Sequence, residues 1–196
     1  MRFIETMFLE NGIVKNLDLH SERSSATILH HFGIRKTLPF TQLLKSQKLC
    51  TLGVYKFRVV YSQDIEDFTV ELYSPRKINS LNLVNGESVD YSFKYEDRSQ
   101  IENLLRSKFS CDDILIIKNG FVTDTSFANI VFSKDGELFT PTTFLLNGTK
   151  RKHLIQIGKI KEIEIPVDDI SRFDKYFLIN SMLDFYPVDR IFRYNF

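Results

Sequence analysis

Residues 90–98 read DYSFKYEDR, and the interpretation of the chain starts from Lys94 at their centre. Thirty residues further on comes Asp124, inside the stretch GFVTDTSFAN. The stretch LNGTKR follows, in which Gly148 and Thr149 are expected to open a helix. No one of these three pieces is specific. Their order and spacing carry the interpretation.

A lysine, a carboxylate and a helix start are the groups that a pyridoxal 5′-phosphate site requires. The lysine amine holds the cofactor aldehyde and has to be desolvated to be nucleophilic. The carboxylate forms a salt bridge with the protonated ring nitrogen, which makes the ring an electron sink. Backbone N–H groups and the Thr149 hydroxyl bind the phosphate. The ordinary alternatives are a solvated Lys94, a turn residue at Asp124 and a plain helix start at Gly148.

Composition narrows the class of protein. The 196 residues suffice for one large domain or two small lobes, and the net charge of +1 argues against a nucleic-acid-binding protein. No apolar run approaches the length of a membrane helix, and the early Glu5 argues against a signal peptide. Cys50 and Cys111 lack metal-ligand spacing, so both are expected to be reduced in a cytoplasmic protein. The four histidines form no metal motif.

The first part of the chain, residues 1–84, is predicted to form a small α+β lobe. Asn11-Gly12 is a strong hairpin signal, and Asp18 is expected to cap a helix that ends at Gly33. The predicted elements are strands at 1–8 and 13–17, helices at 19–32 and 38–44, and strands at 51–61 and 67–73.

Asn85-Gly86 is the predicted link (85–86), and residues 87–196 are predicted to form a larger, mixed-sheet lobe that binds the cofactor. Its expected helices cover 97–109 and 148–157, and its expected strands cover 114–117, 127–132, 137–140, 160–165 and 176–179. Short strands with few helices predict α+β architecture with a barrel-like sheet rather than regular βαβ winding.

Further polar residues are candidates for a site. Arg23 in HSER is either exposed or buried against a phosphate. Asn180-Ser181 follows a predicted buried strand, a position where polar residues often line a site. The groups that recognise the substrate are left unknown by the sequence. The candidates for binding its carboxylate are Arg58, Arg76 and Lys77.

The order of these motifs resembles the class IV aminotransferase family, the pyridoxal phosphate enzymes of fold type IV. Its members include branched-chain and D-amino-acid aminotransferases and 4-amino-4-deoxychorismate lyase. The resemblance covers nearly the whole chain. The matching stretches are FIET (3–6), Asn11-Gly12, HSER (20–23), Lys94 to Arg98, VTD (122–124) with Ala128-Asn129, Thr140-Pro141 and GTKR (148–151).

The resemblance implies a two-lobe, D-amino-acid-aminotransferase-like fold, a homodimer, and a role for each matching residue. Lys94 is the implied catalytic residue and Asp124 the implied partner of the ring nitrogen. Phosphate binding falls to Arg23, Thr149 and Lys150, the last two chiefly through their backbone, and Asn180 and Ser181 stand near the cofactor. The family usually has Glu where this chain has Asp124.

Two reactions on a small-molecule amine begin alike, with Lys94 removing the proton from the amine-bearing carbon. The lyase then releases p-aminobenzoate and pyruvate in folate biosynthesis, whereas an aminotransferase yields a keto acid. The spacing from Lys94 to Arg98 resembles the lyase and favours it. A branched-chain or D-amino-acid aminotransferase, a non-catalytic ligand-binding protein on the same fold and a plain structural protein remain the alternatives.

Overall fold

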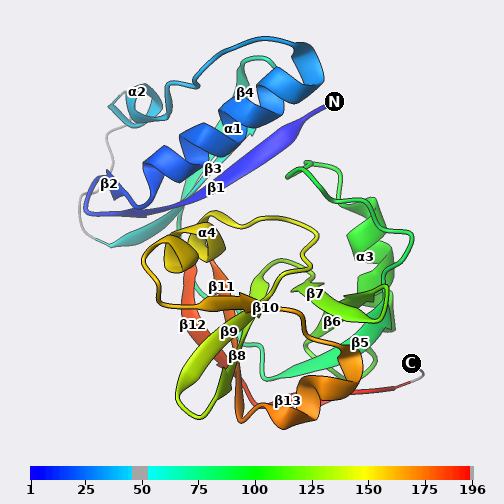
Figure 1. Ribbon diagram of the computed structural model, residues 1–196. Helices are drawn as coiled ribbons and strands as arrows, with labels where there is room; N and C mark the ends of the chain where they lie inside the picture. Colours follow the sequence, from blue (N-terminus) through cyan, green and yellow to red (C-terminus); the bar gives the residue numbers. More distant parts are fainter. Residues whose placement is uncertain (46–52, 195–196) are drawn as a thin grey trace. The chain divides into compact units, whose positions relative to one another are not determined.

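The computed structural model describes residues 1–45 and 53–194, and the chain forms two compact units (Figure 1). Unit 1 consists of Met1–Ser74 with Phe93–Asp97, and unit 2 consists of Pro75–Ser92 with Arg98–Phe196. The predictions for Cys50 and for the start of the strand at 51–61 fall outside the described residues. No helix in the described part of the chain is both long and apolar enough to cross a membrane.

Unit 1 is built on an antiparallel four-stranded sheet in the order β2-β1-β3-β4. The strands are β1 (Phe3–Glu10), β2 (Ile13–Val14), β3 (Val54–Tyr61) and β4 (Ile65–Leu72). The predicted hairpin at Asn11-Gly12 is confirmed, because β1 and β2 pair across it. Both turn residues have positive φ, 50° at Asn11 and 79° at Gly12, as a tight two-residue hairpin requires.

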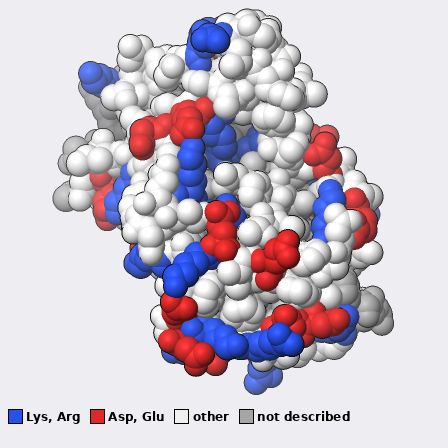
Figure 2. All heavy atoms as spheres, in the orientation of Figure 1, with Lys and Arg blue, Asp and Glu red and all other residues white. Residues whose placement is uncertain are grey.

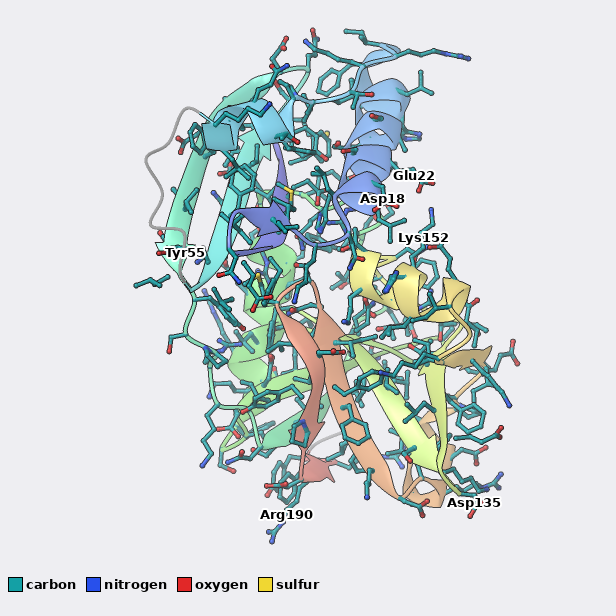
Figure 3. All side chains as sticks on the ribbon, turned by 90° about the vertical axis from the view of Figure 1, so that its left-hand side faces the viewer. Asp18, Glu22, Tyr55, Asp135, Lys152 and Arg190 are labelled. Carbon is teal, nitrogen blue, oxygen red and sulfur yellow. The ribbon has the colours of Figure 1, made fainter. Side chains whose placement is uncertain are left out.

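Two helices belong to unit 1, α1 (Leu17–Phe32) and α2 (Phe40–Lys45). Asp18 is not the N-cap of α1, as the sequence suggested, but lies in its first turn (Figure 3). The cap position belongs to Asn16, which adopts left-handed backbone angles (φ 53°) and so starts the helix earlier. The predicted end at Gly33 is confirmed. Gly33 has left-handed backbone angles (φ 70°), and its N–H donates a hydrogen bond to the Leu29 carbonyl.

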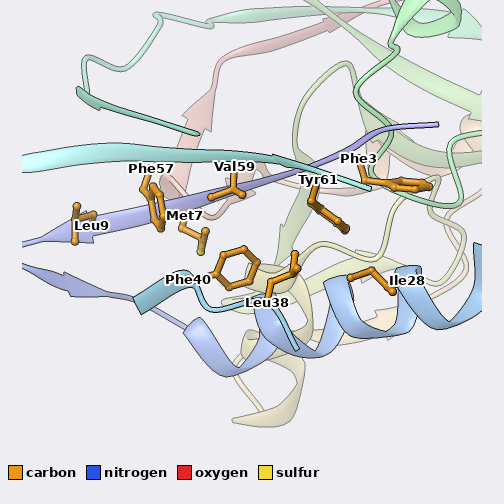
Figure 4. Packing of buried hydrophobic residues seen from close by; sticks show 9 residues of the cluster. All are labelled: Phe3, Met7, Leu9, Ile28, Leu38, Phe40, Phe57, Val59 and Tyr61. Carbon is orange, nitrogen blue, oxygen red and sulfur yellow. The ribbon is translucent and has the colours of Figure 1, made fainter. Parts of the chain in front are cut away.

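The core of unit 1 lies where the sheet packs against the helices and the segment that joins them (Figure 4). Alternate residues of β1, namely Phe3, Met7 and Leu9, are buried in this core. Side chains two residues apart point to the same face of a strand. Glu5 therefore enters the same buried face as Phe3 and Met7, which places a carboxylate in apolar surroundings.

Unit 2 is built on a nine-stranded mixed sheet. Seven strands follow the order β10-β9-β8-β7-β6-β5-β13, and β11 pairs with both β8 and β12. The strands are β5 (Ser80–Asn85), β6 (Asp113–Lys118), β7 (Phe121–Thr125), β8 (Asn129–Lys134), β9 (Glu137–Pro141), β10 (Lys161–Ile163), β11 (Lys175–Asn180), β12 (Leu183–Val188) and β13 (Arg190–Phe192). The sequence pattern does not predict β5, β12 or β13.

The helices of unit 2 are short. They are α3 (Ser99–Leu105), α4 (Thr149–Gln156) and two 3₁₀ segments, η1 (Arg106–Lys108) and η2 (Val167–Arg172). The helix predicted at 97–109 is thus divided into α3 and η1. Antiparallel and parallel pairs with few helices confirm the α+β class.

The units divide at Ser74/Pro75 and not at the predicted link at 85–86. The reason is the pairing of β5, which is bonded in parallel to β6 on one side and to β13 on the other. Asn85-Gly86 consequently lies inside unit 2. The chain then returns to unit 1 for Phe93–Asp97 before it continues in unit 2.

Charged side chains of both signs alternate along the lower part of the face in Figure 2. Among the exposed ion pairs are Lys161 with Glu137 and Arg172 with Asp169. Each exposed pair contributes about 0–1 kcal/mol to the free energy of unfolding, so these pairs are not what holds the fold together.

Candidate active site

Lys94 is fixed in unit 1 by the backbone of β1. Its carbonyl accepts a 2.9 Å hydrogen bond from the Ile4 N–H, and Glu96 N–H donates to the Arg2 carbonyl at 3.0 Å. Between these bonds, Tyr95 forms an isolated antiparallel bridge with Phe3. The segment 93–97 therefore extends the edge of β1, and the half-buried Lys94 takes its position from that strand.

Arg23 is held by Glu5. Its Nε donates to Glu5 Oε1 at 2.8 Å and its Nη2 to Oε2 at 2.5 Å, which is a bidentate pair. His20 Nδ1 lies 2.6 Å from the same Oε2, and the His20 and Glu5 side chains are fully buried. Arg23 keeps 16% of its side chain exposed. Arg23 is therefore not a solvated arginine but is held by a protein carboxylate, and its role toward a phosphate stays a prediction.

Burial alone would raise the pKa of Glu5, but the charge and hydrogen bonds of Arg23, with the His20 bond, lower that pKa to about 2. Burial lowers the pKa of His20, and the charges of Arg23 and Lys94 add to this effect, whereas the hydrogen bond to Glu5 and the charge of Glu5 oppose it. Around Lys94, unit 1 thus combines an ionised Glu5, a cationic Arg23 and a His20 that resists protonation.

Asp124 lies on β7 of unit 2, and its carboxylate accepts hydrogen bonds from three N–H donors. Oδ1 accepts from the Asn129 amide at 2.7 Å. Oδ2 accepts from the backbone N–H groups of Leu145 at 3.0 Å and Leu146 at 2.9 Å. The Asn129 amide also donates to the Leu146 carbonyl at 3.0 Å. Leu145 and Leu146, which precede α4, are therefore hydrogen-bonded directly to Asp124.

Burial raises the pKa of Asp124 to about 6, even though the bonds from Leu146, Asn129 and Leu145 oppose this rise. The carboxylate is therefore mostly ionised at neutral pH and becomes protonated just below it. An ionised carboxylate in a site that excludes water is suited to pair with a cationic ring nitrogen.

Gly148 is the N-cap of α4 and has extended backbone angles (φ −65°, ψ 143°). A Cβ atom at this position would lie 2.1 Å from Asn129 Oδ1, so only glycine fits beside the Asn129 side chain. Thr149 follows it and is buried. The N–H groups of the first turn of α4 have no intrahelical partner by geometry, which makes this helix start suited to an anion.

Lys150 directs its ammonium to Asp184 at 3.0 Å, so any contribution it makes to a phosphate comes from its backbone. Asn180 ends β11, where its Oδ1 accepts from the N–H groups of Met182 at 2.8 Å and Leu183 at 2.9 Å. Its amide donates to the Phe127 carbonyl at 3.4 Å. Asn180 thus shapes the turn that contains Ser181.

The predicted site residues fall into two groups. Arg23 and Lys94 belong to unit 1, and the others belong to unit 2: Asp124, Thr149, Lys150, Asn180 and Ser181. Within unit 2, Asn129 connects Asp124 to the segment before α4, because its amide donates both to Asp124 Oδ1 and to the Leu146 carbonyl.

Sequence reasoning missed the partners of these residues. Glu5, His20 and Asn129 stand inside the matching motifs, but no role was expected for them. Arg151 is also inside a motif and is fully buried. It donates to the Pro141 carbonyl at 2.8 Å, to Glu162 Oε1 at 2.5 Å and to Asn147 Oδ1 at 3.2 Å. A signal was available, because Glu5 interrupts the apolar alternation of β1.

Comparison with known proteins identifies the family. A model of the amino-transferase class IV family matches residues 101–191. An uncharacterized protein of Haemophilus influenzae is 34% identical over 180 residues, which cover 91% of this chain and 96% of that protein.

A crystal structure from Haemophilus somnus 129PT, assigned as a 4-amino-4-deoxychorismate lyase, superposes with a TM-score of 0.80 at 30% identity and covers 92% of this chain and 96% of its own. A Thermotoga maritima protein assigned as a branched-chain-amino-acid aminotransferase is 28% identical over 130 residues, or 61% of this chain and 47% of that protein. The family predicted from the motifs is confirmed: the chain belongs to the amino-transferase class IV family, whose members are enzymes that depend on pyridoxal phosphate.

Proposed function

We propose that this protein is a pyridoxal-phosphate-dependent 4-amino-4-deoxychorismate lyase that forms p-aminobenzoate and pyruvate for folate biosynthesis. We further propose that it acts as a cytoplasmic homodimer. The observation that carries the proposal is the similarity to the Haemophilus somnus protein, which extends over almost the full length of both chains. The Lys94-x-x-x-Arg98 spacing supports the same choice.

The residues of the two units fit pyridoxal phosphate. Unit 1 offers the amine of Lys94. Unit 2 offers the buried carboxylate of Asp124 and the start of α4 at Gly148-Thr149. Position 148 accommodates only glycine. When bound, the cofactor supplies an electron sink that stabilises negative charge at the amine-bearing carbon.

The proposed roles follow from the chemistry of each side chain. Lys94 holds the cofactor aldehyde, and its freed amine removes the proton from the substrate carbon. Asp124, with a pKa of about 6, is ionised at neutral pH and holds the ring nitrogen. The side chain of Asp124 is one methylene shorter than that of the Glu usual in the family. The backbone N–H groups of Leu145 and Leu146 hydrogen-bond to it, so the segment before α4 lies directly beside this shorter side chain.

Phosphate binding is assigned to the N–H groups of Thr149 and Lys150 and to the Thr149 hydroxyl. Arg23 supports this site with its guanidinium held in one orientation by Glu5. Asn180 and Ser181 stand near the cofactor. Because Glu5 neutralises much of the charge of Arg23, the start of α4 supplies the main attraction for the phosphate.

The second candidate is an amino-acid aminotransferase acting on branched-chain or D-amino acids. The observation that favours it is the similarity to the Thermotoga maritima protein. In the structural comparison, a Thermotoga maritima branched-chain aminotransferase superposes with a TM-score of 0.76 at 20% identity, whereas the Haemophilus somnus lyase superposes with a TM-score of 0.80 at 30% identity. The lyase is therefore the better supported of the two reactions.

The first test is chemical labelling of the cofactor lysine. Purified protein with added pyridoxal phosphate is expected to show a visible absorption band that borohydride removes, and peptide mapping is expected to place the reduced cofactor on Lys94. Lys94→Ala should abolish the label, and Lys77→Ala, which alters an exposed lysine, should retain it. Label on another lysine, or no band, would overturn the proposal.

The second test separates the reactions. The lyase should release p-aminobenzoate and pyruvate in equal amounts from aminodeoxychorismate, without a keto-acid acceptor. If the labelled enzyme instead transfers nitrogen from an amino acid to 2-oxoglutarate and releases no p-aminobenzoate, the aminotransferase is correct. A labelled protein that performs neither reaction on a broad amine panel would favour a non-catalytic role.

A further inference from the structure

Unit 2 has a cavity of about 190 Å³ that none of the residues assigned to the cofactor lines. Its walls are the end of β8, β9, the end of β10 with the two residues that follow it, and η2 with Phe173. All of these walls belong to unit 2, and the cavity is partly open to solvent. The β8–β9 hairpin and η2 lie in the lower part of Figure 1, where Figure 2 shows charged side chains of both signs.

Two phenylalanine rings form an apolar wall of the cavity. The Phe173 ring lies 4.9 Å from that of the fully buried Phe132 and 6.3 Å from that of Phe139, measured between centroids. Phe132 and Phe139 are also paired in register between β8 and β9. Phe139 and Phe173, both half-buried, are therefore held in place by a buried neighbour and can receive a further aromatic ring.

Four charged side chains line the same cavity, two of each sign. Arg172 and Asp169 neutralise each other, with Nε 3.1 Å from Oδ1 and Nη1 3.2 Å from Oδ2. Lys134 and Glu164 are exposed, and neither forms an ion pair within residues 1–45 and 53–194. The cavity thus offers one ammonium and one carboxylate, with an apolar wall beside them.

Size and charge define the class of ligand that fits. The volume of about 190 Å³ equals that of about six waters at about 30 Å³ each, and it is below the about 300–1,000 Å³ of drug-sized sites, so the occupant is small. The charges of the lining residues sum to zero, which gives a polyanion no advantage. A ligand with a single charge would use only one of Lys134 and Glu164. A carboxylate, an ammonium and an aromatic ring in one small molecule use every group.

We propose that this cavity binds a free aromatic amino acid such as phenylalanine. Lys134 binds its carboxylate, Glu164 binds its ammonium, and Phe139 and Phe173 contact its ring. The inference goes beyond the proposed function and does not rest on it, because no residue assigned to the cofactor or to the reaction lines the cavity.

The test is calorimetric binding of phenylalanine and of two probes, phenethylamine, which lacks the carboxylate, and 3-phenylpropionate, which lacks the ammonium. The protein is first treated with pyridoxal phosphate and borohydride, because reduction removes the aldehyde that the ligand amine would otherwise attack. Phenylalanine is expected to bind with a Kd below about 1 mM. Each probe should bind at least about threefold more weakly, which is the scale of an exposed ion pair.

Two variants assign each charge to its partner. Lys134→Gln should remove the preference for phenylalanine over phenethylamine but keep the preference over 3-phenylpropionate, and Glu164→Gln should do the reverse. Both variants change exposed side chains, so thermal unfolding should be close to that of the wild type. The matched controls, Lys175→Gln and Glu102→Gln, change exposed residues that do not line the cavity and should keep both preferences.

Hydrogen exchange locates the ligand independently. Ile165, a lining residue, accepts a 2.9 Å hydrogen bond from the Val122 N–H, and the Val167 N–H donates to the Gly120 carbonyl at 2.9 Å. A ligand that holds this wall in place should slow amide exchange at Val122 and Val167. Slower exchange at Leu145 and Leu146 instead would put the ligand beside Asp124 and overturn the inference.

The remaining outcomes separate this inference from the proposed function. Equal binding of phenylalanine and the two probes, no binding of phenylalanine at millimolar concentration, or preferences that neither variant changes would overturn the cavity assignment. These results would leave the labelling of Lys94 untouched. Binding that depends on Lys134 and Glu164 in a protein whose Lys94 is not labelled would keep the cavity assignment while the proposed function falls.

Discussion

The Asp124 carboxylate and the Asn129 amide are joined by a 2.7 Å hydrogen bond, and the same two residues are paired in register where β7 meets β8. The side-chain bond thus reinforces the backbone register at the junction of two strands. Asn129 Oδ1 also lies 2.1 Å from the place where a Cβ atom at position 148 would stand. A larger residue at position 148 would therefore displace Asn129 and disturb its hydrogen bond to Asp124.

Gly148→Ala is expected to destabilise the protein by about 1–3 kcal/mol, since the new Cβ would lie 2.1 Å from Asn129 Oδ1 and displace a hydrogen-bonded side chain. Urea unfolding measures the change. Asn129→Ala removes the obstructing oxygen, so Gly148→Ala should cost less in that background. Equal costs in both backgrounds would show that the contact with Asn129 is not the cause.

Asp124→Asn is expected to remove a pH dependence of stability. The folded-state pKa of Asp124 is raised from 3.8 to about 6, so its contribution is fully present below about pH 4 and is lost as the pH rises through 6. The loss amounts to about 3 kcal/mol. When both proteins are measured at pH 4, 5, 6 and 7, the free energy of unfolding of the wild type should therefore fall relative to that of the variant as the pH rises. A constant difference between the two proteins contradicts the prediction.

Glu5→Gln is expected to destabilise unit 1 by about 2–4 kcal/mol, because it leaves Arg23 partly buried without its counter-charge. The pKa of Glu5 is lowered from 4.5 to about 2, so its stabilisation is present above pH 4.5 and is lost as the pH falls toward 2. The gap between wild type and variant should close over this range in unfolding experiments. The matched control, Glu71→Gln, removes an exposed partner of Lys56 and should change stability little.

Arg151→Lys is expected to cost about 2 kcal/mol, because a lysine cannot reproduce the fork that reaches Pro141, Asn147 and Glu162 together. The variant should also loosen the segment before α4. Amide hydrogen exchange should therefore be faster at Leu145 and Leu146, whose N–H groups bond Asp124. Arg172→Lys, at an exposed ion pair, is the control. Unchanged hydrogen exchange at both amides would show that Arg151 does not stabilise the segment before α4.

Local signals in the sequence predict the local structure well. Asn11-Gly12 specifies its hairpin because both residues tolerate positive φ, and Gly33 ends α1 for the same reason. The partners of β5 could not be predicted in this way. Its pairing with β13 joins residues about 110 positions apart, such as Ser80 and Arg190, and no pattern within either segment contains that information.

The candidate site shows the same difference between local signals, which the sequence contains, and long-range contacts, which it does not. Lys94, Asp124 and Gly148-Thr149 are candidates that residue type, order and spacing indicate, and their roles stay predictions. The bonds of Glu5 to Arg23 and His20 join a strand to a helix more than ten residues away, and they depend on how the two elements pack. The pKa values of Glu5 and Asp124 follow from burial, which a sequence motif does not state.

The chain passes between its two units at 74/75, 92/93 and 97/98. Neither unit is therefore a contiguous gene segment, and a fragment ending at Ser74 would lack both the segment that pairs with Phe3 and Lys94 itself. After a single proteolytic cut at 74/75, residues 1–74 would be held to the rest of the chain only by non-covalent contacts such as the pairing of Phe3 with Tyr95. Exchange of one unit between relatives by recombination would need three coordinated breakpoints, so the two units are expected to be inherited together.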